Sequence, residues 1–180
     1  MEILNAANRL VARAGVTRLT IEAVAQEAGL SKGGVLYHFP TKEALVEGMV
    51  EHLLVSFDQD LAQTLDQETE DAGHWLRAYI RASSYTAPGE AEVANSLVAA
   101  LATYPRLLDA VKARYEEWQQ RVEHDGLSPT LATIIRLAVD GLWFAELLQL
   151  APPTGELRED VVQTLLGLAR QVGREQGEHR

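Results

Sequence analysis

Two adjacent glycines, Gly33 and Gly34, lie inside a predicted short helix, where each costs about 1 kcal/mol relative to alanine. Glycines in a helix make sense if another surface must lie against the segment and leaves no room for side chains. Lys32, Tyr37 and Lys42 place cations and a hydroxyl around this gap. Such groups suit the oxygens of a phosphate backbone. A tight turn with exposed polar residues would have the same composition, and this alternative stays open.

The elements that must position these residues are two short helices and the start of a third. Thr20 is placed to cap the first helix with its hydroxyl, and Gly29 ends it as a residue that readily adopts positive φ. Ser31 is placed to cap the second helix, which Phe39 and Pro40 close. Two helices joined by a glycine-containing turn form the helix-turn-helix layout, whose second helix enters the major groove of DNA.

The stretch SKGGVLYHFPTKEAL at residues 31–45, with TIEAVA at residues 20–25 before it, resembles the DNA-binding domain of the TetR family of bacterial transcriptional regulators. The resemblance covers about the first 48 residues and is specific in residue types, spacing and position. It implies an all-α protein of about nine helices. Its three-helix DNA-binding domain would be residues 1–48, and its effector-binding and dimerisation domain residues 49–180.

The DNA contacts that we expect come from the glycine-containing segment and its flanks. Lys32, Tyr37 and Lys42 are expected to contact phosphates, and Gly33 to permit close approach. Base edges or sugars are expected near Gly34, Val35 and His38. The capping residues Thr20, Ser31 and Thr41 complete the predicted interface.

The net charge of −10 is unusual for a protein that binds DNA. Residues 1–48 contain five basic residues (Arg9, Arg13, Arg18, Lys32, Lys42) and five acidic ones (Glu2, Glu22, Glu27, Glu43, Glu47), so their charges sum to zero. All of the negative charge therefore lies beyond residue 48. A neutral DNA-binding segment should bind DNA of arbitrary sequence weakly.

The composition argues against several other classes of protein. The chain of 180 residues has no cysteine, which excludes disulfides and thiolate metal sites. Its five histidines are scattered and no strand-linked phosphate loop or GxSxG motif occurs. We therefore expect no catalysis, cofactor or metal. No 18-residue stretch is free of charge, and no signal peptide is evident, which predicts a soluble cytoplasmic protein.

From Thr41 a helix is predicted to run to about Leu65, a length of about 38 Å. Further helices are expected at 74–86, 90–103, 105–124, 128–149 and 156–172. Aromatic and polar residues on their inward faces are candidates for a small-molecule pocket. These are Trp75, Tyr79, Ser83, Tyr104, Tyr115, Trp118 and Trp143. Ordinary core packing would use the same residues.

The last two predicted helices are apolar on more than one face, which one packing surface cannot absorb. We expect them to form a symmetric four-helix dimer seam. The residues predicted for that seam are Leu131, Ile135, Ala138, Leu142, Ala145, Val161, Leu165 and Leu168. A buried helix pair within a monomer is the alternative.

Together these patterns predict a homodimeric regulator, most simply a repressor that a small-molecule effector releases from a palindromic operator. Residues 1–48 carry no net charge, and the predicted first helix begins almost at Met1, so we expect no minor-groove contacts by a basic arm. These two features leave a second hypothesis open. In that hypothesis the chain is a helical ligand-binding or interaction protein whose DNA-binding domain no longer functions.

Overall fold

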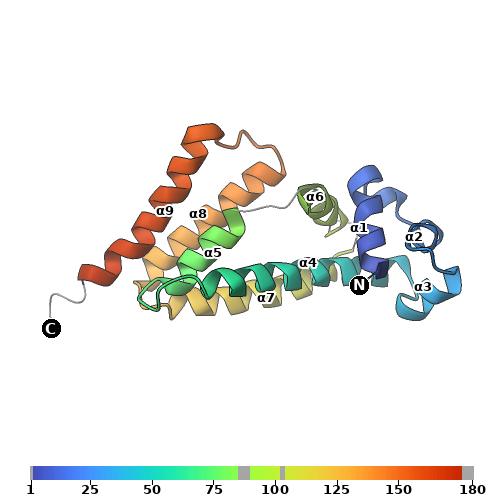
Figure 1. Cartoon of the computed structure of the whole chain (residues 1–180), viewed down its shortest axis with the longest axis horizontal. Coiled ribbons are helices and arrows are strands. Elements are labelled where there is room, and N and C mark those ends of the chain that lie inside the picture. The colour runs from blue at the N-terminus through green and yellow to red at the C-terminus, as the bar shows by residue number, and fades with distance from the viewer. Residues whose placement is uncertain (1, 85–89, 102–103, 176–180) are drawn as a thin grey trace. The chain divides into compact units, whose positions relative to one another are not determined.

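The structure is a computed structural model that describes residues 2–84, 90–101 and 104–175. In these residues the chain forms nine α-helices and no strand, which confirms the predicted all-α fold (Figure 1). The helices are α1 Glu2–Ala14, α2 Ile21–Ala28, α3 Lys32–His38, α4 Lys42–Leu65, α5 His74–Ser84, α6 Glu90–Leu101, α7 Leu107–Glu123, α8 Pro129–Leu147 and α9 Gly155–Glu175. A short 3-10 helix, η1, at Val16–Arg18 was not predicted.

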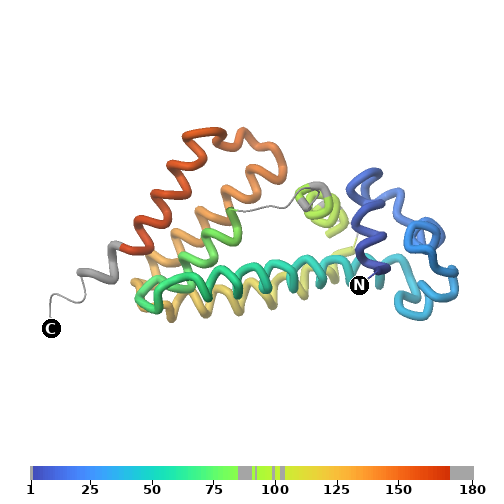
Figure 2. Tube along the Cα trace, viewed as in Figure 1, coloured from blue at the N-terminus to red at the C-terminus, as the bar shows by residue number. Residues whose placement is uncertain are grey.

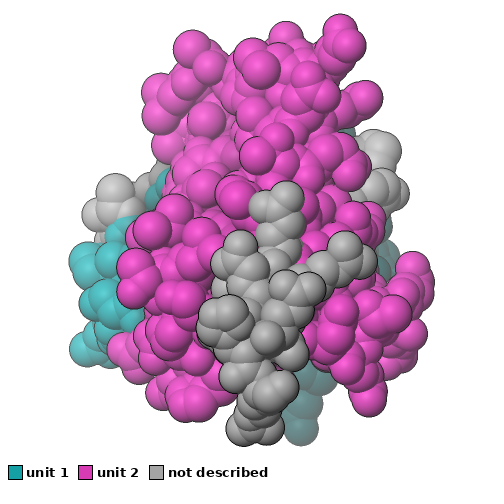
Figure 3. All heavy atoms as spheres, turned by 90° about the vertical axis from the view of Figure 1, so that its left-hand side faces the viewer, with its two compact units in different colours: residues 1–56, 86–113 teal, residues 57–85, 114–180 magenta. Residues whose placement is uncertain are grey.

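The chain divides into two compact units, which Figure 3 colours separately. Unit 1 comprises residues 1–56 and 86–113, and unit 2 comprises residues 57–85 and 114–180. Of the three divisions between the units, one falls within α4 and one within α7, and the third, between residues 85 and 86, lies outside the described residues. Among the described helices, none is long and apolar enough to cross a membrane.

Unit 1 is built on α1, which packs against α2 and α6, while α2 packs against α3. Its core consists of small and branched apolar residues that are at most 1% exposed: Ala6, Ala7, Val11, Val24, Val35, Leu45 and Val46. These residues recur on single faces of their helices, as amphipathic helices around one core require. The helix-turn-helix is therefore held from one side and leaves its other side to solvent.

Three hydroxyl caps fix the helix starts in unit 1, as the sequence predicts. Thr20 accepts a hydrogen bond from the amide of Ala23 at 3.1 Å, and Ser31 accepts one from Gly34 at 3.0 Å. Thr41 does the same for Ala44 at 3.0 Å. Each bond satisfies an amide that has no partner within its helix. Gly29 ends α2 with φ of 67°, in the left-handed region that favours glycine.

Phe39, at the C-terminal end of α3, lies against Gly48 of α4. A Cβ added to Gly48 would lie 2.6 Å from Cε1 of the Phe39 ring, so any larger residue would displace the ring. The glycine lets the aromatic ring lie on the backbone of α4, and this contact ties α3 to α4.

Unit 2 contains α5, α8 and α9, which all pack on one another, and Figure 2 shows how the loop after α8 turns the chain back into α9. Its core includes Leu76, Ala78, Ile80, Ile135 and Leu166. Ser128 and Pro129 open α8 as predicted, but the Ser128 side chain makes no capping bond. The prediction of a serine cap is wrong there.

The predicted helix ends differ from the structure at several places. α7 begins at Leu107 rather than at Pro105, because residues 105 and 106 lie in a turn that the bond from the Leu107 N–H to the Tyr104 carbonyl closes. α8 ends at Leu147 and α9 continues to Glu175. The predicted ends of two other helices, at 85–86 and 102–103, lie outside the described residues.

A buried arginine, Arg77 of α5, organises the loop between α4 and α5. Its side chain is 2% exposed and pairs with Glu68 at 2.8 Å and with Asp71. It also donates to the carbonyls of Thr69 and Ala72. Burial alone would raise the pKa of the Glu68 carboxyl, but hydrogen bonds from Arg77 and Arg81 outweigh burial and hold that pKa below its ordinary value.

Asp125, in the loop after α7, caps the start of α5 from a distant part of the sequence. Its carboxylate accepts hydrogen bonds from the amides of Trp75 at 2.9 Å and Leu76 at 2.8 Å. Its backbone carbonyl accepts a hydrogen bond from the amide of Gly73. Burial raises the pKa of the Asp125 carboxyl, although the two amide bonds act in the opposite direction. Arg77 and Asp125 thus fix the same end of α5.

Arg77→Met is expected to lower the free energy of unfolding by about 3–5 kcal/mol, because it leaves the buried Glu68 carboxylate without its buried cation partner. Arg81→Met is the matched control, since Arg81 is 43% exposed and pairs with the same carboxylate. It should cost less than about 1 kcal/mol. Urea unfolding of both variants measures the difference, and equal losses would contradict the role given to Arg77.

Candidate nucleic-acid interface and aromatic cluster

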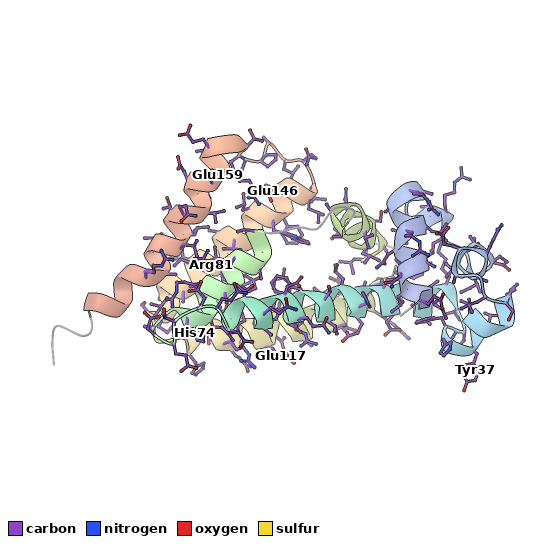
Figure 4. All side chains as sticks on the ribbon, viewed as in Figure 1. Tyr37, His74, Arg81, Glu117, Glu146 and Glu159 are labelled. Atoms are coloured by element: carbon purple, nitrogen blue, oxygen red, sulfur yellow. The ribbon has the colours of Figure 1, made fainter. Side chains whose placement is uncertain are left out.

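The helix α3 presents most of the predicted DNA-contacting residues on its outer surface. Lys32, Gly33, Tyr37 and His38 are exposed, and Gly34 is half-buried. Tyr37 is 84% exposed and its side chain points away from the ribbon of α3 (Figure 4). Its ring meets the His38 ring edge to face at 5.2 Å. Burial of this side chain contributes little to the stability of the fold, and the ring and hydroxyl are accessible to a partner.

Val35 differs from its neighbours on α3, because its exposed fraction is 0%. Its side chain belongs to the core of unit 1 and cannot reach a base edge. We therefore remove Val35 from the predicted DNA contacts. The sequence pattern alone does not separate the inner from the outer face of so short a helix.

Neither glycine of α3 is required by the packing of the chain. A Cβ on Gly33 would meet only the Ser31 hydroxyl at 3.9 Å, and one on Gly34 would meet the same oxygen at 3.4 Å. Neither residue is among those with positive φ. Alanine would therefore fit both positions in the free protein. The glycines keep a surface flat that no described part of the chain covers.

The cations near this surface are largely paired within the protein. Lys32 pairs with Glu22 of α2, and Lys42 donates to the Thr17 carbonyl at 3.5 Å. The carboxylate of Glu27 pairs with both Arg9 and Arg13 of α1, at 2.9 and 2.6 Å. Among the described residues of 1–48, Arg18 and Lys42 are the two basic residues without a carboxylate partner. These pairs have no local signal in the sequence, because the packing of the helices brings together residues that are ten or more positions apart.

The capping residues Thr20, Ser31 and Thr41 are exposed but already use their side-chain oxygens as acceptors within the protein. Each hydroxyl still has a proton to donate. Contact with a phosphate oxygen would therefore not break the caps.

Four of the predicted pocket residues form one aromatic cluster in unit 2, together with Phe57. Trp75 stacks on Tyr79 at a centroid distance of 5.3 Å, and Trp118 lies 5.8 Å from Tyr79 and 4.9 Å from Tyr115. Phe57 contacts both Tyr79 and Trp118. The rings come from α4, α5 and α7. Trp75, Tyr79 and Trp118 are buried, while Phe57 and Tyr115 are half-buried.

Carboxylates accept hydrogen bonds from the polar atoms of this cluster. The Tyr79 hydroxyl donates to Asp140 at 2.6 Å, and Arg136, one helical turn before Asp140 on α8, pairs with the same carboxylate. The indole of Trp118 donates to Asp58 at 3.0 Å. Burial raises the pKa of Asp140, and burial followed by the charge of Asp140 raises the pKa of Tyr115 to about 12. Tyr115 is therefore neutral at physiological pH.

The other three pocket candidates do not belong to this cluster by any described contact. Ser83 is half-buried on α5. Tyr104 belongs to unit 1. Trp143 packs edge to face on Phe144 of α8 at 4.9 Å. The aromatic cluster is thus narrower than the set predicted from sequence.

The residues predicted for the dimer seam differ in their exposure to solvent. Ile135 and Leu165 are buried within unit 2 and are part of its own core, so we remove them from the predicted seam. Ala138 and Leu168 are exposed, while Leu131, Leu142, Ala145 and Val161 are half-buried. An exposed stripe also follows α8 at intervals of three and four residues, through Ile134, Leu137, Gly141, Phe144 and Leu148.

Comparisons with known proteins bear on both ends of the chain. Residues 3–49 match the family described as "Bacterial regulatory proteins, tetR family". Residues 73–170 match "Tetracyclin repressor-like, C-terminal domain". The second match alone covers more than half of the chain.

Among curated proteins, the chain is similar to the HTH-type transcriptional regulator TtgR of Pseudomonas putida, with 33% identity over 69 residues. That alignment covers 38% of this chain and 32% of TtgR, so the chain matches about a third of the length of this relative.

Among solved structures, a transcriptional regulator from Rhodococcus sp. Rha1 has a TM-score of 0.74 at 22% identity, covering 94% of this chain and 95% of its own. The multidrug binding protein EbrR complexed with ethidium has a TM-score of 0.67 at 23% identity, covering 93% and 96%. These two likenesses show the fold.

Gly33→Ala is expected to raise the free energy of unfolding by up to about 1 kcal/mol, because alanine is the better helix former and meets no obstacle. Gly48→Ala is the matched helical glycine in unit 1, and it should destabilise the protein because its Cβ meets the Phe39 ring. Thermal unfolding followed by circular dichroism compares the two. A destabilising Gly33→Ala would show that this glycine serves the fold.

Proposed function

The chain belongs to the TetR family of bacterial regulatory proteins, and we propose that it is a cytoplasmic DNA-binding repressor that a small-molecule effector releases from a palindromic operator. Residues 1–48 would bind DNA, and residues 49–180 would bind the effector and form the dimer. The observation that carries this proposal is the uncovered surface at Gly33 and Gly34, whose glycines the fold itself does not need.

The DNA contacts follow from exposure on α3 and from the charge of Lys42, which is half-buried at the start of α4. Lys32, Tyr37 and Lys42 would contact phosphates, because two are cations and the third has an exposed hydroxyl. Gly33 would let the strand approach the helix backbone. Gly34 and His38 would then lie toward base edges or sugars.

Dimerisation would place two copies of α3 in successive major grooves, about 34 Å apart. The exposed stripe on α8 supports this part of the proposal, since an unpaired apolar face of that length is unfavourable in water. Leu157 and Leu168 add exposed apolar surface on α9. The two helices would meet their copies across a two-fold axis, as in a four-helix bundle.

The effector would be a planar aromatic molecule that binds at the aromatic cluster. Aromatic walls with a few polar groups are typical of ligand sites, and EbrR, of the same fold, is described as a multidrug binding protein complexed with ethidium. The rings of Trp75, Tyr79 and Trp118 contact one another, so a ligand must separate them. Binding would release DNA only if the ligand prefers the dimer shape that fits DNA poorly.

One observation favours a second function, a helical ligand-binding or interaction protein that does not bind DNA. Three of the five basic side chains in residues 1–48 are held by carboxylates of the same segment: Arg9, Arg13 and Lys32. The two functions make opposite predictions for DNA binding.

The DNA-binding function predicts that the protein enriches one family of palindromic duplexes from a random-sequence library. Its affinity for them should fall steeply with salt, and Lys42→Ala should make the slope of log K against log salt shallower by about one unit. Gel shifts at several salt concentrations measure this slope. Gly33→Ala should bind the same duplexes more weakly despite its greater stability.

Arg121→Ala is the control, because it removes one exposed cation from unit 2 and should leave the slope unchanged. Failure to enrich any sequence would favour the second function. A slope for Lys42→Ala equal to that of the unaltered protein would remove Lys42 from the phosphate contacts.

Native mass spectrometry tests the dimer and the effector together. We expect a species of twice the 19.8 kDa chain mass, and planar aromatic compounds among the small molecules released when the purified protein is unfolded. A single-chain species at micromolar concentration would contradict the dimer. Release of aliphatic compounds alone would contradict the proposed ligand class.

A further inference from the structure

The ion pair between Lys32 and Glu22 lies on the surface that is proposed to face DNA. Glu22 belongs to the first turn of α2 and Lys32 is the first residue of α3, so the pair bridges the two helices of the helix-turn-helix. The side chains are 57% and 62% exposed, for Lys32 and Glu22 respectively. A DNA strand that approaches Lys32 therefore meets a carboxylate at the same place.

Glu22 is ionised at neutral pH. The hydrogen bond from Lys32 holds the pKa of the Glu22 carboxyl below its ordinary value. Its negative charge repels phosphates and satisfies the lysine ammonium. Phosphate and Glu22 thus compete for one cation.

The other carboxylate of the helix-turn-helix, Glu27, has a different arrangement. It joins α2 to α1 through Arg9 and Arg13, so neither of its ion pairs involves α3. Among the described residues, Glu22 is the one carboxylate that pairs with a proposed DNA contact of α3.

We propose that Glu22 is a specificity-determining residue, which holds Lys32 and thereby weakens binding to DNA on which α3 cannot dock fully. This inference rests on the proposed DNA-binding function. Contact with arbitrary DNA depends on loose phosphate contacts, and here a carboxylate competes with the phosphate for the cation and repels it. On a matching site, base contacts fix α3 in the groove and bring one phosphate to Lys32, which exchanges its partner.

Glu22 competes with phosphate for Lys32 but does not hold the lysine permanently. Exposed ion pairs contribute little to stability, so Lys32 can leave Glu22 when a fixed phosphate is offered. The device therefore reduces binding to all other DNA more than binding to the correct site.

The experiment compares Glu22→Gln with the unaltered protein on two duplexes, one enriched by the unaltered protein and one of scrambled sequence. Glu22→Gln should bind the scrambled duplex about three- to tenfold more tightly at low salt, with a salt slope steeper by up to about one unit. Its affinity for the enriched duplex should change by less than about twofold, so the ratio of the two affinities falls.

Glu47→Gln is the matched control, since Glu47 is exposed in unit 1 and its carboxylate forms no ion pair with any described residue. It removes the same charge and should leave the affinity ratio unchanged. In a Lys32→Ala background the effect of Glu22→Gln on the scrambled duplex should vanish. Circular dichroism verifies that each variant is folded.

An affinity ratio for Glu22→Gln that equals that of the unaltered protein or of Glu47→Gln would overturn the inference. So would an effect of Glu22→Gln that persists without Lys32, because it would then be general charge repulsion. If the unaltered protein enriches no duplex at all, the proposed function fails and the inference falls with it. Enrichment with an unchanged ratio defeats the inference alone.

Discussion

Seven residues that include two glycines are too few to form a stable helix in water, so α3 depends on contacts outside itself. The Ser31 hydroxyl caps its start, Val35 anchors it in the core of unit 1, and the Phe39 ring lies on Gly48 of α4. These contacts all act at the ends or on the inner side. The outer side can then keep its glycines without loss of the fold, and the proposed function depends on that freedom.

Charge is handled differently in the two units. In the helix-turn-helix, the exposed Glu22 and the half-buried Glu27 hold exposed cations, which keeps the segment neutral and its attraction to arbitrary DNA weak. In unit 2 the paired charges lie deeper, as in the contact of Arg77 with Glu68 and of Arg136 with Asp140. A buried pair is costly to break, so these contacts fix loops and helix ends. The same unit contains the aromatic cluster, whose rings are held in place by Asp58 and Asp140.

Local signals in the sequence predicted most of the fold, and most of the failures concern contacts or helix faces that only the folded chain defines. Caps at Thr20, Ser31 and Thr41 and the turn at Gly29 depend on neighbouring residues alone, and all were confirmed. The partners of Glu22, Gly48 and Asp125 were missed, because each contact joins segments whose approach only the folded chain defines. Residue types also could not separate the buried Ile135 and Leu165 from the exposed Ile134 and Leu137, since helices that are apolar on several faces lack a clear periodicity.

The central claim is that two copies of α3 lie against DNA at a fixed separation. Hydroxyl-radical footprinting on a duplex that the protein enriches from a random library tests this claim most directly, because it maps where the backbone is covered. The account predicts two protected patches on one face of the duplex, centred about 34 Å apart. A single patch, or protection spread evenly along the duplex, would contradict it.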